Sequence, residues 1–293
     1  MQSSYKHRNG DRKDGRLLRT LPAINVFMPH IMPKKSSGLI YYDESYDVTA
    51  ADKCLRTERV AGYKGMGYMH FIIAAYIRCI SMLPGMNRFV AGRKIFARNT
   101  VTVALTVRRS LNIDGTESVV KVEFEPTDTI FDVYRKINEK LEEVRTGTDI
   151  NTVEDFMSIG ARFPRFMLKF IMWILSILDY FGRLPAQIAE GSPYHASLMI
   201  TDTSTMKIRP VYHNIPEFGN IPLYYTFGAK RTVYEPDKHG NLTGRKYVDT
   251  KLVIDGRITD DHYYAQFLQA MRYIFAHPEI LEKTPTRVIE DVG

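Results

Sequence analysis

Helix-like and strand-like segments follow one another in this chain without a regular strand–helix–strand alternation. "TVTVALTV" (100–107), "ESVVKVEFEP" (117–126) and "RKYVDTKLVID" (245–255) have the β-branched, alternating pattern of strands. "TIFDVYRKINEKLEEVR" (129–145) has helical spacing, and "GYMHFIIAAYIRCISMLPGMN" (67–87) predicts a strongly apolar helix. The pattern predicts an α/β or α+β protein built on a mixed β-sheet, and we expect the α/β class with helices flanking the sheet.

Further segments complete the prediction. Strands are predicted for "AINVFMPHIM" (23–32), "HASLMITD" (195–202) and "PLYYTFGAKRTVYEP" (222–236), and a helix for "AADKCLRTER" (50–59). No internal repeat divides the chain. The length allows one large domain or two small ones, and we expect a single domain over residues 16–293, preceded by a basic flexible tail over residues 1–15.

The formal net charge is +7, but much of the positive excess lies in the tail "YKHRNGDRKDGRLLR". Because no aromatic residues are interleaved with these charges to stack on bases, we expect no nucleic-acid partner. The two cysteines, Cys54 and Cys79, form no metal or redox motif, which fits a reducing compartment. The N-terminus is charged and has no apolar stretch with a cleavage site, so we expect no secretory signal. We expect a cytoplasmic protein without a metal.

The segment 162–185, "RFPRFMLKFIMWILSILDYFGRLP", is nearly all apolar between Phe166 and Phe181. A membrane-spanning helix needs about 20 apolar residues, whereas Lys169 and Asp179 interrupt this shorter run. Three interpretations remain open: a buried or interface helix, a membrane-surface helix flanked by arginines, or a wall for an apolar acyl substrate.

The order of segments resembles the acyltransferase core of 2-oxo-acid dehydrogenase complexes, which shares its fold with chloramphenicol acetyltransferase. "YYDESYDVTAADK" (41–53) is similar to an early strand of that family and the helix start that follows it. Residues 69–107 are similar to its long helix, hairpin and core strand, and residues 197–231 to its later strand–loop–strand. Residues 251–281 resemble its last strand, catalytic turn and final helix, and end in "HPEIL". The resemblance implies a chloramphenicol acetyltransferase-like fold in a homotrimer that can build into larger assemblies.

The turn after the last strand reads DHRxxDG in that family, and its histidine is the general base that activates the acceptor. In this chain Asp255, Arg257 and Asp260 match the motif, Gly256 occupies the histidine's position, and Asp261 replaces the final glycine. The resemblance therefore implies a turn whose frame is present and whose base is absent.

Other candidate site residues follow from the same resemblance. Asp260 is expected to pair with an arginine that holds the turn, for which Arg16 and Arg19 are the candidates. Thr201 is either the family's hydrogen-bond donor to the tetrahedral oxyanion or an ordinary strand threonine. His262 is either a relocated base or a residue of a helix N-terminus.

These expectations lead to two functional hypotheses. The first is a stand-alone acyltransferase that takes an acyl group from a coenzyme A thioester, with its general base relocated or absent. The alternative is a non-catalytic descendant that keeps the trimer for a structural, cage-forming or ligand-binding role. No lipoyl or biotin lysine motif occurs in the sequence, so we expect no lipoyl attachment site.

Overall fold

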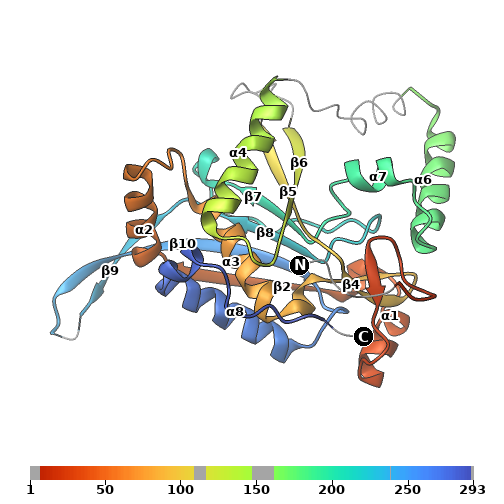
Figure 1. The fold of residues 1–293 in the computed structure, drawn as a ribbon, viewed down its shortest axis with the longest axis horizontal. Coiled ribbons are helices and arrows are strands. Elements are labelled where there is room, and N and C mark those ends of the chain that lie inside the picture. Colours follow the sequence, from red (N-terminus) through yellow and green to blue (C-terminus); the bar gives the residue numbers. More distant parts are fainter. Residues whose placement is uncertain (1–6, 109–116, 147–161, 238, 292–293) are drawn as a thin grey trace.

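The computed structural model describes residues 7–108, 117–146, 162–237 and 239–291 of the chain (Figure 1). Its strands are β1 (Gly15–Leu17), β2 (Leu39–Asp47), β3 (Arg88–Ala91), β4 (Lys94–Arg98), β5 (Val101–Arg108), β6 (Glu117–Phe124), β7 (Leu198–Asp202), β8 (Leu223–Phe227), β9 (Arg231–Pro236) and β10 (Leu242–Asp255). Its α-helices are α1 (Ala23–Ile31), α2 (Thr49–Val60), α3 (Tyr68–Met82), α4 (Ile130–Thr146), α6 (Arg165–Tyr180), α7 (Ala186–Gly191) and α8 (Asp261–Ala276).

The main sheet has the order β2-β10-β8-β7-β5-β6, and β9 pairs with β10 beyond the end of β8. β10 runs antiparallel to β2 and β8, whereas β7 runs parallel to both β8 and β5. The described residues therefore form a mixed sheet flanked by helices, and the predicted fold class is confirmed. A smaller sheet, β1-β4-β3, accompanies it.

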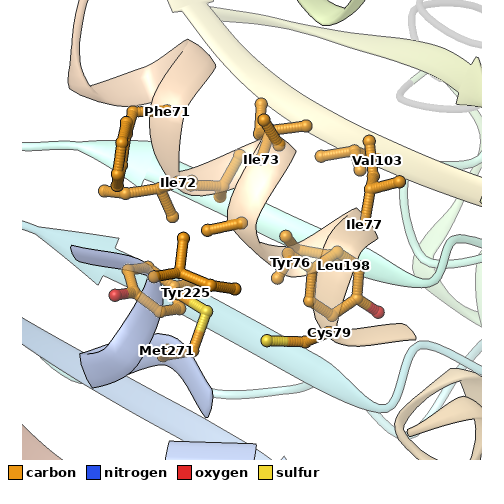
Figure 2. Close-up of a cluster of buried hydrophobic side chains, with 14 of the residues drawn as sticks. Phe71, Ile72, Ile73, Tyr76, Ile77, Cys79, Val103, Leu198, Tyr225 and Met271 are labelled. Carbon is orange, nitrogen blue, oxygen red and sulfur yellow. The ribbon is translucent and has the colours of Figure 1, made fainter. Parts of the chain in front are cut away.

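Helix α3 lies in the centre of the hydrophobic core. Its residues from His70 to Ser81 are all buried, because apolar side chains cover every side of the helix rather than one stripe. Figure 2 shows Phe71, Ile73 and Ile77 of this helix among side chains from β5, β7, β8 and α8. The long apolar segment predicted at 67–87 is therefore the core helix of the fold.

Residues 23–31 form helix α1, so the strand predicted for residues 23–32 is wrong. Ile24, Phe27 and Ile31 recur at helical spacing and are 62, 63 and 64% exposed. Such a short apolar run is compatible with either a strand or a helix face, and the helix begins directly after Pro22.

The first fifteen residues are not all a free tail. Arg12, from the segment predicted to be flexible, is bound by Asp14 and by Asp179 of α6, with N–O distances of 2.9 Å in both ion pairs. Gly15 already begins β1, which pairs with β4. Residues 1–6 of the predicted tail lie outside the described residues.

Helix α6 is the apolar segment singled out in the sequence. In Figure 1 it stands beside α7, away from α3 and α8. Only Leu175 and Asp179 of the helix are buried, while Phe166, Phe170 and Trp173 are 73, 59 and 58% exposed. None of the helices in the described ranges combines the length and hydrophobicity needed to cross a bilayer.

Candidate functional site

The turn that follows β10 is held by an ion pair between two of its own residues. Arg257 donates from Nε to Asp255 Oδ1 and from Nη2 to Asp255 Oδ2, each at 2.7 Å. The side chains are 5 and 2% exposed, respectively. Arg257 also donates from Nη1 to the carbonyl oxygen of Met32 at 3.2 Å. This two-pronged geometry satisfies both charges, which fixes the turn without help from another segment's charges.

Gly256 is packed against the beginning of β2. Its N–H donates to the carbonyl oxygen of Gly38 at 2.7 Å. A Cβ at this position would lie 2.6 Å from Ile40 Cδ1 and 2.9 Å from the Gly38 carbonyl oxygen. Any larger side chain therefore requires the start of β2 to move. The position where the resemblance puts the family's histidine is closed by packing as well as changed in sequence.

Asp260 lies at the surface, and its expected pairing with an arginine is wrong. Its Oδ1 accepts a hydrogen bond from the N–H of Tyr263 at 2.9 Å, which makes it the N-cap of α8. Arg16 lies 3.7 Å from Glu290, and Arg19 donates to the carbonyl oxygen of Asn9 at 2.7 Å. The carboxylate of Asp260 therefore caps the helix that begins next to it, a role that requires no arginine partner.

His262 is exposed in the first turn of α8, and its Nε2 lies 2.9 Å from the amide nitrogen of Gln266. Gln266 is one helical turn further along, so this contact is local to the helix surface. The position matches the helix N-terminal interpretation of His262. A role as a relocated base stays a hypothesis without a contact to the turn that supports it.

Thr201 lies in β7, and its hydroxyl is 2.9 Å from Tyr224 OH and 3.3 Å from Thr106 Oγ1. Through the strand register it is level with Thr226 of β8 and Lys251 of β10. Gly256 is five residues further along from Lys251, or about 16 Å at 3.3 Å per residue. Within one chain the threonine and the turn do not face each other. A site that used both would need Thr201 from one subunit and the turn from another.

No protein-family profile and no curated protein sequence matches the chain. Solved structures do match. A probable dihydrolipoamide acetyltransferase from Listeria monocytogenes superposes with a TM-score of 0.57 at 14% identity, over 94% of this chain and 99% of that one. The cubic core of the pyruvate dehydrogenase multienzyme complex gives 0.57 at 13%, over 90 and 93%. A chloramphenicol acetyltransferase gives 0.55 at 8%, over 89 and 99%.

The chain has the chloramphenicol acetyltransferase-like fold. The fold expected from the resemblance is therefore confirmed along most of the chain. At these identities the likeness extends to the acyltransferase-core fold alone, so the chemistry has to be argued from this chain's own residues.

Near the turn, the acyltransferase-core fold buries one amine that the sequence analysis did not single out. Lys35 donates from Nζ to the carbonyl oxygens of Pro216 and Gly219, at 2.9 and 3.0 Å. Burial lowers the pKa of Lys35 to about 8, against the opposing charge of Asp255. Two carbonyl acceptors hold this nitrogen, so its evident role is to tie the 216–219 loop to the start of β2.

A histidine–carboxylate pair lies apart from the turn, where α6 meets the loop before β7. His195 Nε2 is 3.3 Å from Asp179 Oδ2, and Arg12 Nη2 is 2.9 Å from Asp179 Oδ1. Burial alone would raise the pKa of the Asp179 carboxyl, but the bonds and charges of His195 and Arg12 outweigh it and lower that pKa. His195 is 6% exposed, and neither ring nitrogen has a hydrogen bond of good geometry in the described part of the chain, so its contact with Asp179 is one of ion-pair distance.

This pair borders a cavity of about 410 Å³, which is also lined by Arg98, Lys121 and Leu184. Clustered, buried titratable groups in a cavity are typical of functional sites. One signal was visible in the sequence: Asp179 is the only carboxylate in the largely apolar helix α6. The approach of His195 and Arg12 was not predictable, because both are far from Asp179 along the chain. Among the described residues no group of three His, Cys, Asp or Glu is placed to hold a metal.

Proposed function

We propose that the protein is a non-catalytic descendant of the acyltransferase-core fold that serves as a trimeric scaffold. The observation that carries the proposal is the packing of Gly256, where a Cβ would lie 2.6 Å from Ile40 and 2.9 Å from a backbone oxygen. A general base contributes about 10² to 10⁴-fold to such reactions, and neither Asp260 nor His262 is placed to supply it. The fold is kept while the family's catalytic position is filled by the protein itself.

The apolar face of α6 supports the trimer. Phe166, Phe170 and Trp173 recur at i, i+4 and i+7 and point to one side of the helix, where they are more than half exposed. Exposed apolar patches of this kind normally mark interfaces. One matching structure is the cubic core of a multienzyme complex, which is the kind of assembly that this scaffold would form with further copies of itself. We propose α6 as a contact between subunits.

Light scattering coupled to size exclusion tests the assembly. We expect a trimer mass for the wild type and a smaller species for the double variant Phe170→Ser with Trp173→Ser. Tyr234→Ser is the matched control, because Tyr234 of β9 is 70% exposed and lies outside α6. A monomer mass for the wild type contradicts the trimer. A wild-type monomer that binds anionic liposomes through the same residues supports the membrane-surface interpretation of residues 162–185 instead.

A second candidate, acyl transfer from a coenzyme A thioester with a relocated base, is favoured by His195. Its Nε2 lies 3.3 Å from Asp179, and a carboxylate that orients an imidazole in a cavity is the arrangement of a general base. In this reaction His195 would take the proton of the acceptor, whose oxygen or sulfur would attack the thioester carbonyl. Coenzyme A would leave as its thiol.

Release of coenzyme A from a panel of acyl-CoA donors, followed with a thiol reagent, separates the two candidates. The scaffold proposal predicts no turnover above the background rate with any common acceptor. Turnover that falls at least a hundredfold in His195→Gln, and stays unchanged in His262→Ala, would establish the second candidate. Circular dichroism of both variants shows whether a loss of rate reflects a loss of folding.

A further inference from the structure

The interior of the cavity beside α6 contains a buried cation whose hydrogen-bond partner is neutral. Arg98 is 8% exposed and donates from Nη2 to the side-chain oxygen of Asn220 at 2.8 Å. Its Nε has no hydrogen-bond partner in the described part of the chain, and its guanidinium lies 4.5 Å from the centre of the Phe89 ring. A buried charge is costly unless it is paired and fully hydrogen-bonded. The Nε atom is covered by its neighbours, so what remains unmet is the charge of Arg98, which no ion pair in the described part of the chain neutralises.

A second cation lies nearby with an equally neutral partner. Lys121 of β6 donates from Nζ to the carbonyl oxygen of Ala189 at 2.9 Å. Within the described ranges neither Lys121 nor Arg98 forms an ion pair, although the charge of Asp14 acts on both. Burial, with the repulsion of Arg98 next, lowers the pKa of Lys121 to about 8. The two positive charges thus influence each other across the same cavity.

The two carboxylates nearest Arg12, the half-exposed Asp14 and the buried Asp179, are already engaged. Asp14 and Asp179 both bind Arg12, at 2.9 Å each. Asn220 also donates to Asp14 at 2.7 Å. The other two carboxylates that line the cavity, Glu123 and Glu190, are exposed at its rim. Two positive charges that line the cavity, Arg98 and Lys121, are therefore left without an ion pair in the described part of the chain.

We propose that this cavity binds a small monocarboxylate, whose oxygens are held by Arg98 and Lys121. The fork of a guanidinium matches the planar geometry of a carboxylate. The fixed negative charges of Asp14 and Asp179 favour a singly charged ligand over a phosphate dianion, since each added charge increases the repulsion. Leu184, Ala186 and Ala189 give the cavity an apolar wall, which suits a short alkyl chain.

The proposal is independent of whether acyl transfer occurs. Calorimetric titration of the full-length protein with butyrate, acetate and inorganic phosphate at constant ionic strength tests it. We expect saturable binding with butyrate tightest, acetate weaker and phosphate weakest. Replacing one charged hydrogen-bond donor, in Lys121→Met, should weaken butyrate about tenfold. Lys13→Met is the matched control, because Lys13 carries the same charge at the exposed rim.

Arg98→Lys is a second test, because lysine keeps the positive charge but lacks the planar guanidinium that matches a carboxylate. This variant should bind butyrate more weakly than the wild type while it stays folded, and circular dichroism checks the folding. Binding that is tighter for phosphate than for butyrate overturns the assignment of a monocarboxylate. Equal losses in Lys121→Met and Lys13→Met, or the absence of saturable binding by any of the three anions, overturn the site.

Discussion

The turn at residues 255–261 and the cavity beside α6 differ in how fully their polar groups are paired within the chain. In the turn, Asp255 and Arg257 neutralise each other and Asp260 caps a helix. In the cavity, Arg98 and His195 are buried with atoms that lack hydrogen-bond partners among the described residues. The resemblance to a catalytic family predicts a site at the turn, but the charged groups of the turn already have partners within the chain. Buried atoms without hydrogen-bond partners in the described ranges occur beside the cavity, where that resemblance predicted nothing.

The largest expected effect comes from breaking the ion pair of the turn. Asp255→Ala leaves Arg257 buried and unpaired, which should lower the free energy of unfolding by about 3 to 5 kcal/mol. Asp249→Ala is the matched control in the same strand. Its partner Arg231 is 46% exposed, so the loss should be about 1 kcal/mol or less. Urea unfolding measures the free energy of unfolding of both variants. Equal losses would mean that the ion pair of the turn stabilises the protein no more than the surface pair does.

Next in size is Gly256→Ala, which tests whether the position to which the resemblance assigns the family's histidine is closed. The added methyl collides with Ile40 and the Gly38 carbonyl oxygen, and overpacking of this kind costs up to about 3 kcal/mol. Gly244→Ala is the control in β10, where the nearest atom is a movable Thr232 methyl at 3.3 Å. We also expect Gly256→His to gain no acyl-CoA turnover. A stable, active Gly256→His protein would show that the turn is merely disarmed.

A third prediction concerns the cavity and its pH dependence. Asp179→Asn should lower the free energy of unfolding at pH 7 by about 2 kcal/mol, because it removes charged hydrogen bonds. The lowered pKa of Asp179 means that the unfolded chain binds its proton first as pH falls through the ordinary value of 3.8. The wild type therefore loses the contribution of this carboxylate in acid, and the variant, which lacks it, should lose less. Parallel curves for the two proteins between pH 6 and 3 contradict this.

The smallest effect is expected at Asp260. Asp260→Ala removes an exposed N-cap, which costs about 1 kcal/mol, whereas Asp260→Asn keeps a good cap and should be nearly neutral. Thermal unfolding followed by circular dichroism measures the two variants against the wild type. A large loss of thermal stability in Asp260→Asn would contradict the role as a helix cap. It would favour the buried arginine pairing predicted from the resemblance.

The fold was predictable where periodicity and burial agree, and the site where contacts are local. The alternation in β5 and the apolar run of α3 each admit one structure, because length and pattern point the same way. Helix α1 was missed because ten residues of mixed apolar spacing fit either element. For Asp260 the sequence does not tell a helix cap from a buried ion pair, since both use an aspartate after a strand. The approach of Arg12, Asp179 and His195 depends on tertiary packing alone.

The burial of α3 from His70 to Ser81 has a consequence for the chemistry of its cysteine. Cys79 has no exposed surface, and burial raises the pKa of its thiol far above the ordinary value. Cys54 of α2 is partly exposed, although burial and the neighbouring Glu282 raise its pKa to about 11. An alkylating reagent can therefore reach Cys54 in the native protein but can modify Cys79 only when the core opens. The rate of that second modification measures global opening of the domain, from a reporter that the chain already carries.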